Sequence, residues 1–140
     1  MTVIGAMWFS GAVRLPPCAA ILSDCSTRQR RTWRCWGEIG EGLVIYHGHG
    51  TVIAPYSIGK NFSVYQGVTI GRNAKPGREI NNPIIGDNVT VFTNAVVAGG
   101  ITIGDNVTIG AGAVVMKDVP ANSIVMGNPC VIREKQPSGV

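Results

Sequence analysis

Aliphatic residues recur at every sixth position through the second half of this chain. The first series comprises Ile85, Val91, Val97, Ile103, Ile109 and Val115. A second apolar series follows it by four positions and comprises Val89, Ala95, Ile101, Val107, Ala113 and Val119. A six-residue period fits neither a 3.6-residue helix nor the two-residue alternation of an extended strand. It fits a short strand and a tight corner that repeat.

The residues three positions after each aliphatic of the first series are suited to corners. They are Asn88, Asn94, Gly100, Asn106, Gly112 and Asp118, and such residues adopt a left-handed backbone at low cost. Three strand-and-corner units close a triangular coil of about eighteen residues, and such coils stack in parallel about 4.8 Å apart. The sequence therefore predicts an all-β parallel β-helix with aliphatic ladders inside it.

The same period occurs earlier in the chain with two interruptions. The earlier members are Val52, Ile58, Val64 and Ile70 in the first series, Tyr56, Phe62, Val68 and Ala74 in the second, and Asn61, Gly67 and Asn73 at the corners. Ile39 and Ile45 precede them one residue out of phase, so we expect one extra residue near residues 47–50, HGHG. Residues 74–83, AKPGREINNP, break the period again and should loop out of the stack. Because repeats form a scaffold and insertions carry function, we expect a site at these interruptions.

The length of the chain favours a single domain. It has 140 residues, of which 45% are hydrophobic and only 6% aromatic, so the core must be built from aliphatic residues. We expect residues 1–36 to form an N-terminal cap with one short helix near residues 19–23. The repeats should occupy residues 37–133 and decay after Val115, and residues 134–140 should form a flexible tail.

Several classes of protein are disfavoured. The basic segment 28–36, RQRRTWRCW, accompanies no nucleic-acid-binding motif, so we interpret it as a solvated part of the cap and expect no nucleic-acid partner. No stretch approaches the roughly 18 apolar residues of a transmembrane helix, and the N-terminus lacks the basic region of a signal peptide. We expect a cytoplasmic protein with reduced thiols at its four cysteines, Cys18, Cys25, Cys35 and Cys130.

Several segments resemble the serine acetyltransferase branch of the hexapeptide-repeat acyltransferases. They are GLVIYHGHGTVI, the IGKN and IGDN corners, IGAGAVV, and the closing KDVPANSIVMGNPCVI. The resemblance covers roughly residues 37–133. It implies a left-handed β-helix, although parallel crossovers are generally right-handed. It also implies a homotrimer with active sites between subunits, and acetyl-coenzyme A (acetyl-CoA) as the acetyl donor.

The resemblance assigns roles to individual residues. His47 matches the general base, while His49, Tyr46, Asn81, Asn82 and Arg78 are candidates for contacting or orienting the acceptor. The groove that holds acetyl-CoA corresponds to Ala111, Gly112, Lys117, Gly127, Pro129 and Arg133. There, backbone amides would hold the pantetheine arm and cations would meet phosphate. A zinc site of three histidines is set aside because the chain has only two, and no metal is expected.

Three positions depart from the serine acetyltransferase pattern. Thr32 replaces the aspartate that partners the general base, Tyr46 replaces an acidic residue, and Asn81-Asn82 replaces an Arg-His pair that contacts serine. We therefore expect an O-acetyltransferase that acts on a sugar or another small alcohol, with L-serine a poor acceptor. The alternatives are serine O-acetyltransferase proper and a non-catalytic β-helical scaffold.

Cys130 offers one further catalytic alternative. A thiol can carry an acyl group, but thiolate activation needs a neighbouring base, and no histidine is near Cys130 in the sequence. A small core substitution for alanine is the favoured interpretation of this residue.

Overall fold

The computed structural model describes residues 7–9, 13–14, 34–74, 77 and 79–136. These residues form seventeen short strands in three sheets. Sheet A has the order β1 (Met7–Phe9), β5 (Leu43–Ile45), β8 (Ser63–Val64), β11 (Thr90–Val91), β14 (Thr108–Ile109), β16 (Ser123–Met126), β17 (Val131–Glu134). Sheet B has the order β13 (Thr102–Ile103), β10 (Ile84–Ile85), β7 (Ser57–Ile58), β4 (Glu38–Ile39), β2 (Val13–Arg14). Sheet C has the order β15 (Val114–Val115), β12 (Val96–Ala98), β9 (Thr69–Gly71), β6 (Val52–Ile53), β3 (Arg34–Cys35). The described part of the chain contains no helix that could span a membrane.

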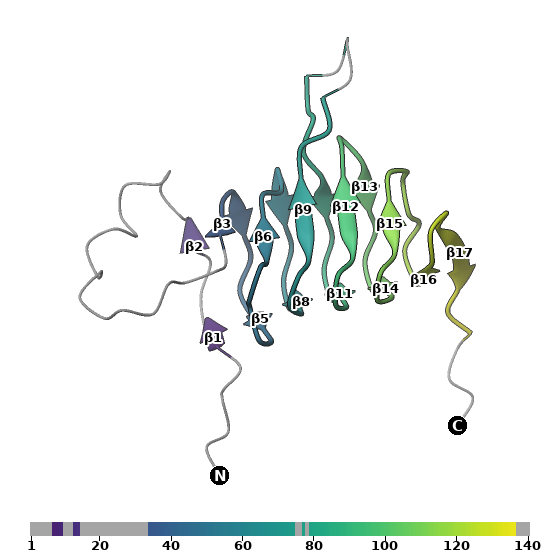
Figure 1. Cartoon of the computed structure of the whole chain (residues 1–140). Coiled ribbons are helices and arrows are strands. Elements are labelled where there is room, and N and C mark those ends of the chain that lie inside the picture. Colours follow the sequence, from purple (N-terminus) through teal and green to yellow (C-terminus); the bar gives the residue numbers. More distant parts are fainter. Residues whose placement is uncertain (1–6, 10–12, 15–33, 75–76, 78, 137–140) are drawn as a thin grey trace, which may run out of the picture.

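The chain visits the three sheets in a fixed order, B to A to C, from β4 to β15. Each strand pairs in parallel with the strand one coil away, for example β8 with β11 and β11 with β14. The result is the predicted parallel β-helix, a three-sided prism whose coils follow one another along its axis (Figure 1). We name its edges after the sheets that the chain joins there, namely the A–C, C–B and B–A edges.

Each sheet contributes one ladder of buried residues to the core. The ladder of sheet A comprises Ile45, Val64, Val91, Ile109 and Val125. That of sheet B comprises Ile39, Ile58, Ile85, Ile103 and Val119. That of sheet C comprises Cys35, Ile53, Ile70, Val97 and Val115. Burial of each Val or Ile contributes about 1.5–3 kcal/mol to folding, so the ladders are the main source of stability.

The register between the first and second coils differs from the prediction. Ile53 rather than Val52 points into the core, because Ile53 is fully buried and pairs with Ile70. Ile53 follows Ile45 by eight positions instead of six, so the insertion at residues 47–50 adds two residues and not one. Ile58 then follows after only five positions, which restores the phase.

Two predicted core positions are wrong for related reasons. In the shortened side before Ile58, Pro55 is buried at the corner and Tyr56 is 56% exposed. Ala74 is also exposed, because the chain has left the stack at that point.

Six of the nine predicted corner residues adopt a left-handed backbone. Positive φ occurs at Asn61, Gly67, Asn88, Asn94, Asn106 and Gly112. At residues 99–100 the positive φ belongs to Gly99 and not to Gly100, and Asn73 and Asp118 do not adopt it.

The predicted loop leaves the stack between β9 and β10, at the C–B edge, and projects beyond the coils (Figure 1). Its base is fixed by two hydrogen bonds. The Asn73 amide donates to the Asn81 carbonyl at 3.2 Å, and Asn82 Nδ2 donates to the Ala54 carbonyl of the preceding coil at 2.7 Å.

The two ends of the prism are closed by antiparallel strands. β1 and β2 pair with β5 and β4 at the first coil, and β17 pairs back on β16 at the last. β3 already belongs to the stack, so the repeats begin before residue 37. The stack also does not decay after Val115, because Val125 completes the ladder of sheet A. The helix predicted near residues 19–23 lies outside the described residues.

Candidate active site

The A–C edge carries the first interruption of the repeat. The hydrogen bonds between coils show which residues occupy equivalent positions. His49 accepts from the Gly67 amide at 2.9 Å, as Gln66 accepts from Asn94 at 3.1 Å and Thr93 accepts from Gly112 at 2.9 Å. On the other side, the Tyr46 amide donates to Val64 as the Tyr65 amide donates to Val91. The two inserted residues are therefore His47 and Gly48.

His47 projects from the prism at this insertion. It is exposed and has a φ of 54°, a left-handed conformation that histidine tolerates better than most residues. The His47 carbonyl accepts a hydrogen bond from the His49 amide, and the Gly48 carbonyl accepts one from the Thr51 amide at 3.3 Å. These bonds form a tight turn that presents the His47 imidazole to solvent. His49 lies beside it and is also exposed.

Three aromatic rings stack outside sheet A, next to the insertion. Tyr46 and Tyr65 have ring centroids 4.6 Å apart and planes within 16°, and Tyr65 and Phe92 have centroids 5.0 Å apart and planes within 22°. Each ring follows a core aliphatic of sheet A by one residue, so the register of the paired strands puts the three on one column. We did not predict this stack, although the aromatic residues at equivalent repeat positions were a usable signal.

Two further residues at this edge have unusual surroundings. Thr51 is fully buried, and its hydroxyl donates to the Tyr65 carbonyl at 3.1 Å. The side-chain oxygen of Gln66 is buried and has no hydrogen-bond partner in the described chain. A buried acceptor in this state is uncommon, and it lies in the coil next to the insertion.

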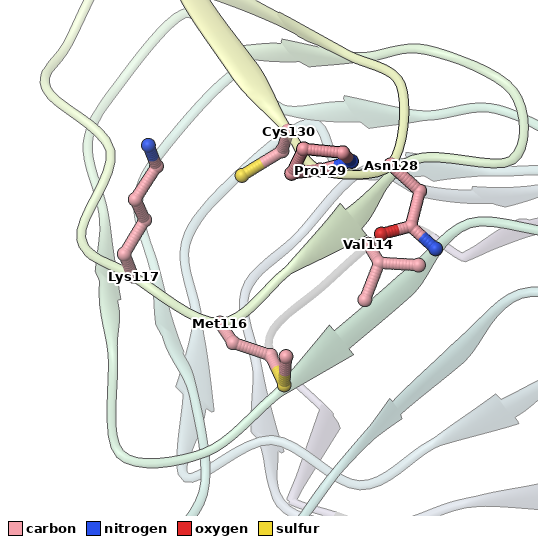
Figure 2. A pocket seen from close by; sticks show the side chains of 6 residues that line it. All are labelled: Val114, Met116, Lys117, Asn128, Pro129 and Cys130. Carbon is pink, nitrogen blue, oxygen red and sulfur yellow. The ribbon is translucent and has the colours of Figure 1, made fainter.

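A pocket lies at the other end of the stack, where the turn after β16 meets β15. Its volume is about 280 Å³. Figure 2 shows its lining, which consists of Val114, Met116, Lys117, Asn128, Pro129 and Cys130. Two predicted groove residues, Lys117 and Pro129, are among these. The Cys130 side chain also packs against the core, as expected for a substitution of alanine.

The remaining groove residues divide between two places. Ala111 and Gly112 are exposed on the A–C edge, and a methyl group on Gly112 would meet no atom within 4 Å, so the backbone is accessible there. Gly127 lies next to this edge, since its carbonyl accepts from the Val114 amide at 3.3 Å. Arg133 is exposed on β17. The pocket and the insertion are three strands apart in sheet C, from β15 to β6, or about 14 Å along the axis.

The structure does not bring the loop asparagines to His47 within one chain. Asn81 and Asn82 lie at the C–B edge, between β9 and β10, and His47 lies at the A–C edge, between β5 and β6, so sheet C separates them. Arg78 and Thr32 lie outside the described residues. Among the described residues, no three side chains of the metal-binding types come together.

The thiol of Cys35 is buried in the core, and its surroundings change its pKa. Burial raises its pKa to about 11, because desolvation disfavours the thiolate. Since the thiolate is the reactive form, Cys35 is a core residue and not a nucleophile.

Comparison with known proteins agrees with this geometry. Residues 82–117 match the family described as bacterial transferase hexapeptide, six repeats. Over these residues the chain carries the hexapeptide repeats of that family. Its β-helix is left-handed, as the family resemblance implied.

The relatives of this hexapeptide-repeat chain include several serine acetyltransferases. It is 48% identical over 93 residues to the serine acetyltransferase of Staphylococcus xylosus, and the aligned residues make up 66% of this chain and 43% of that enzyme. It is 47% identical over 93 residues to serine acetyltransferase 1, chloroplastic, of Arabidopsis thaliana, which covers 66% of this chain and 29% of that protein. The chain thus spans less than half the length of these relatives.

Solved structures give the same result. The crystal structure of Neisseria gonorrhoeae serine acetyltransferase superposes with a TM-score of 0.64 at 37% identity, covering 76% of this chain and 40% of that one. A structure of the same enzyme in complex with serine gives a TM-score of 0.60 at 37% identity, covering 71% and 39%. These comparisons favour the serine-type alternative over the sugar or small-alcohol acceptor expected from the sequence.

Proposed function

We propose that this domain transfers an acetyl group from acetyl-CoA to the hydroxyl of L-serine, with His47 as the general base. The observation that carries the proposal is the position of His47. It lies on a two-residue insertion at the A–C edge of a β-helix that is nearly half identical to serine acetyltransferases. One structural relative was crystallised with serine.

The chemistry requires a base because a hydroxyl is a weak nucleophile at neutral pH. A neutral imidazole has a ring nitrogen that can accept this proton. His47 takes the hydroxyl proton as the oxygen attacks the thioester carbonyl. The tetrahedral intermediate then breaks its carbon–sulfur bond, and the imidazolium returns the proton to the departing coenzyme A thiolate. The products are an O-acetyl ester and coenzyme A.

The residues that would hold acetyl-CoA fit an extended ligand. The pocket at the turn 127–130 offers apolar walls and the cation of Lys117. From there the open backbone of Ala111 and Gly112 follows the A–C edge toward His47. Backbone amides and an ammonium group are suited to a pantetheine arm and a phosphate.

A homotrimer would complete the site. The outer surface of sheet C is largely aliphatic: it includes Val52, Ala54, Val96, Ala98, Val114 and Met116, with the polar Thr69 between Val52 and Val96. Threefold packing would cover such a face and close the assembly. It would also allow the loop of a second copy, with its Asn81 and Asn82, to reach His47, which one chain alone does not permit.

An uncharged acceptor is the second candidate. The described residues of the A–C edge include no Asp, Glu, Lys or Arg, and Asn81-Asn82 cannot supply the cation that a carboxylate favours. These features fit a neutral sugar or alcohol better than a zwitterion.

One titration followed by one assay tests these candidates. Acetyl-CoA at about a hundred times its dissociation constant should stabilise the protein by roughly 2.7 kcal/mol, measured as a shift of the thermal midpoint against desulfo-coenzyme A as a control. Thiol release from acetyl-CoA is then followed with L-serine and with a panel of neutral sugars. Serine-dependent release supports the proposal, release with sugars alone supports the second candidate, and no shift at millimolar acetyl-CoA would support the non-catalytic scaffold.

A further inference from the structure

The insertion that carries His47 needs support from outside itself. Most residues of a coil are held by backbone hydrogen bonds to the equivalent residues of the next coil. His47 and Gly48 are inserted, so they have no equivalent residues in the second coil. The residues that flank them must therefore fix the insertion. Both flanks lead to one residue of the second coil, Tyr65.

The flank before His47 is held by aromatic stacking. Tyr46 packs its ring on that of Tyr65 with centroids 4.6 Å apart, and Phe92 packs on the far face of Tyr65 at 5.0 Å. We call these three rings the aromatic ladder. Because Phe92 backs Tyr65, the middle ring is held on both faces, and Tyr46 rests on a fixed surface.

The flank after His47 is held by the backbone of Tyr65. The Thr51 hydroxyl donates to the Tyr65 carbonyl at 3.1 Å, and the Thr51 side chain is fully buried. The Thr51 amide donates to Gly48 inside the insertion at 3.3 Å. Tyr65 thus contacts one flank through its ring and the other through its carbonyl.

We propose that Tyr65 is the positioning residue for His47, acting through the aromatic ladder and Thr51. This inference rests on the proposed function, in which His47 is the base. Tyr46 directly precedes His47, so the ring that stacks on Tyr65 belongs to the neighbour of the base. The aromatic ladder fixes the backbone that carries the His47 imidazole. A displacement of about 1 Å at a catalytic group can lower the rate up to 10²-fold.

Three variants test the proposal by their kinetics. Tyr65→Leu removes the stacking but keeps apolar bulk, and should lower kcat about 10- to 10²-fold with the KM for acetyl-CoA unchanged. Tyr65→Phe keeps the stacking and should retain most of the wild-type kcat that Tyr65→Leu loses. Thr51→Val removes only the hydroxyl donor and should lower kcat by a smaller factor.

A core variant controls for loss of stability. Val107→Ala opens a cavity three coils away from the insertion, where Val107 is fully buried, and should lower the thermal midpoint without lowering kcat below that midpoint. A loss of kcat in Val107→Ala equal to that in Tyr65→Leu would overturn the positioning role. So would full activity of Tyr65→Leu, or failure of Tyr65→Phe to restore activity.

Hydrogen–deuterium exchange at residues 47–50 provides a readout that does not depend on activity. Tyr65→Leu should speed exchange of these amides at least tenfold relative to wild type, and Val107→Ala should leave them unchanged. Unchanged exchange in Tyr65→Leu overturns the inference. If the wild-type protein shows no acetyl transfer with serine or sugars, the proposed function fails, and the exchange result still decides whether Tyr65 orders the insertion.

Discussion

At the scale of single residues, the insertion that carries His47 is flanked by residues that contact the next coil. The break in the repeat singled out residues 47–50, because an insertion in a strict period is visible without a structure. Tyr65, Thr51 and Gln66 were not predicted as site residues, because their contacts with the insertion run between coils. Stacking at 4.6 Å between Tyr46 and Tyr65 depends on the register across the insertion, which the sequence did not determine.

The two histidines should differ in their effect on catalysis. His49 occupies an ordinary corner position, equivalent to Gln66 and Thr93, whereas His47 is an inserted residue. We expect His49→Ala to lower kcat less than tenfold. Steady-state thiol-release assays of both alanine variants check this order, and a larger loss in His49→Ala than in His47→Ala would exchange their roles.

Cys35 predicts a pH dependence of stability. Its folded-state pKa of about 11 lies above the unfolded value of roughly 8.5. The unfolded chain therefore loses the Cys35 proton at a lower pH than the folded chain does. The contribution of this thiol to the free energy of unfolding is fully present below about pH 8.5 and is lost as the pH rises toward 11. The slope should reach about 1.4 kcal/mol per pH unit and should be absent in Cys35→Val. Urea unfolding of both proteins at pH 8 and pH 10.5 measures the difference, and equal slopes would contradict it.

At the scale of strands and corners, the period predicted the stack, the ladders and the loop. It failed where two aliphatics are adjacent. Val52 and Ile53 both satisfy an aliphatic pattern, so periodicity alone could not decide which points inward after an insertion. For the last coil the sequence predicted repeats up to residue 133 but not their phase, because the corner at Pro120 and Ala121 does not follow the six-residue spacing.

Close packing at the B–A edge gives a stability prediction. A methyl group on Gly86 would overlap Asp105 Oδ1 and lie 3.0 Å from the Gly104 carbonyl carbon. That carboxylate already accepts from the Asp87 amide at 2.8 Å, so it cannot move without loss of a hydrogen bond. Gly86→Ala should therefore cost about 1–3 kcal/mol. Gly71→Ala, whose methyl group meets no atom of the same chain within 4 Å, is the matched control in urea unfolding, and equal stability of the two variants would show that the corner is not tightly packed.

At the scale of the whole molecule, the prism has one largely aliphatic outer face, and the residues proposed for the site lie at two of its edges. The proposed association of three chains would account for both features. Light scattering at micromolar concentration should give three times the 14.8 kDa mass of the chain. A monomer would leave His47 and the loop asparagines apart and would remove the basis for a shared active site.

The most direct test of the account is the acetyl-transfer rate of His47→Ala with the acceptor that the wild-type protein uses. A base acts in the transition state and not in donor binding, so kcat should fall by about 10²- to 10⁴-fold while the acetyl-CoA dissociation constant stays nearly unchanged. Near-full activity of His47→Ala would contradict the assignment of the base. Loss of donor binding and of assembly together with activity would show instead that His47 is a structural residue.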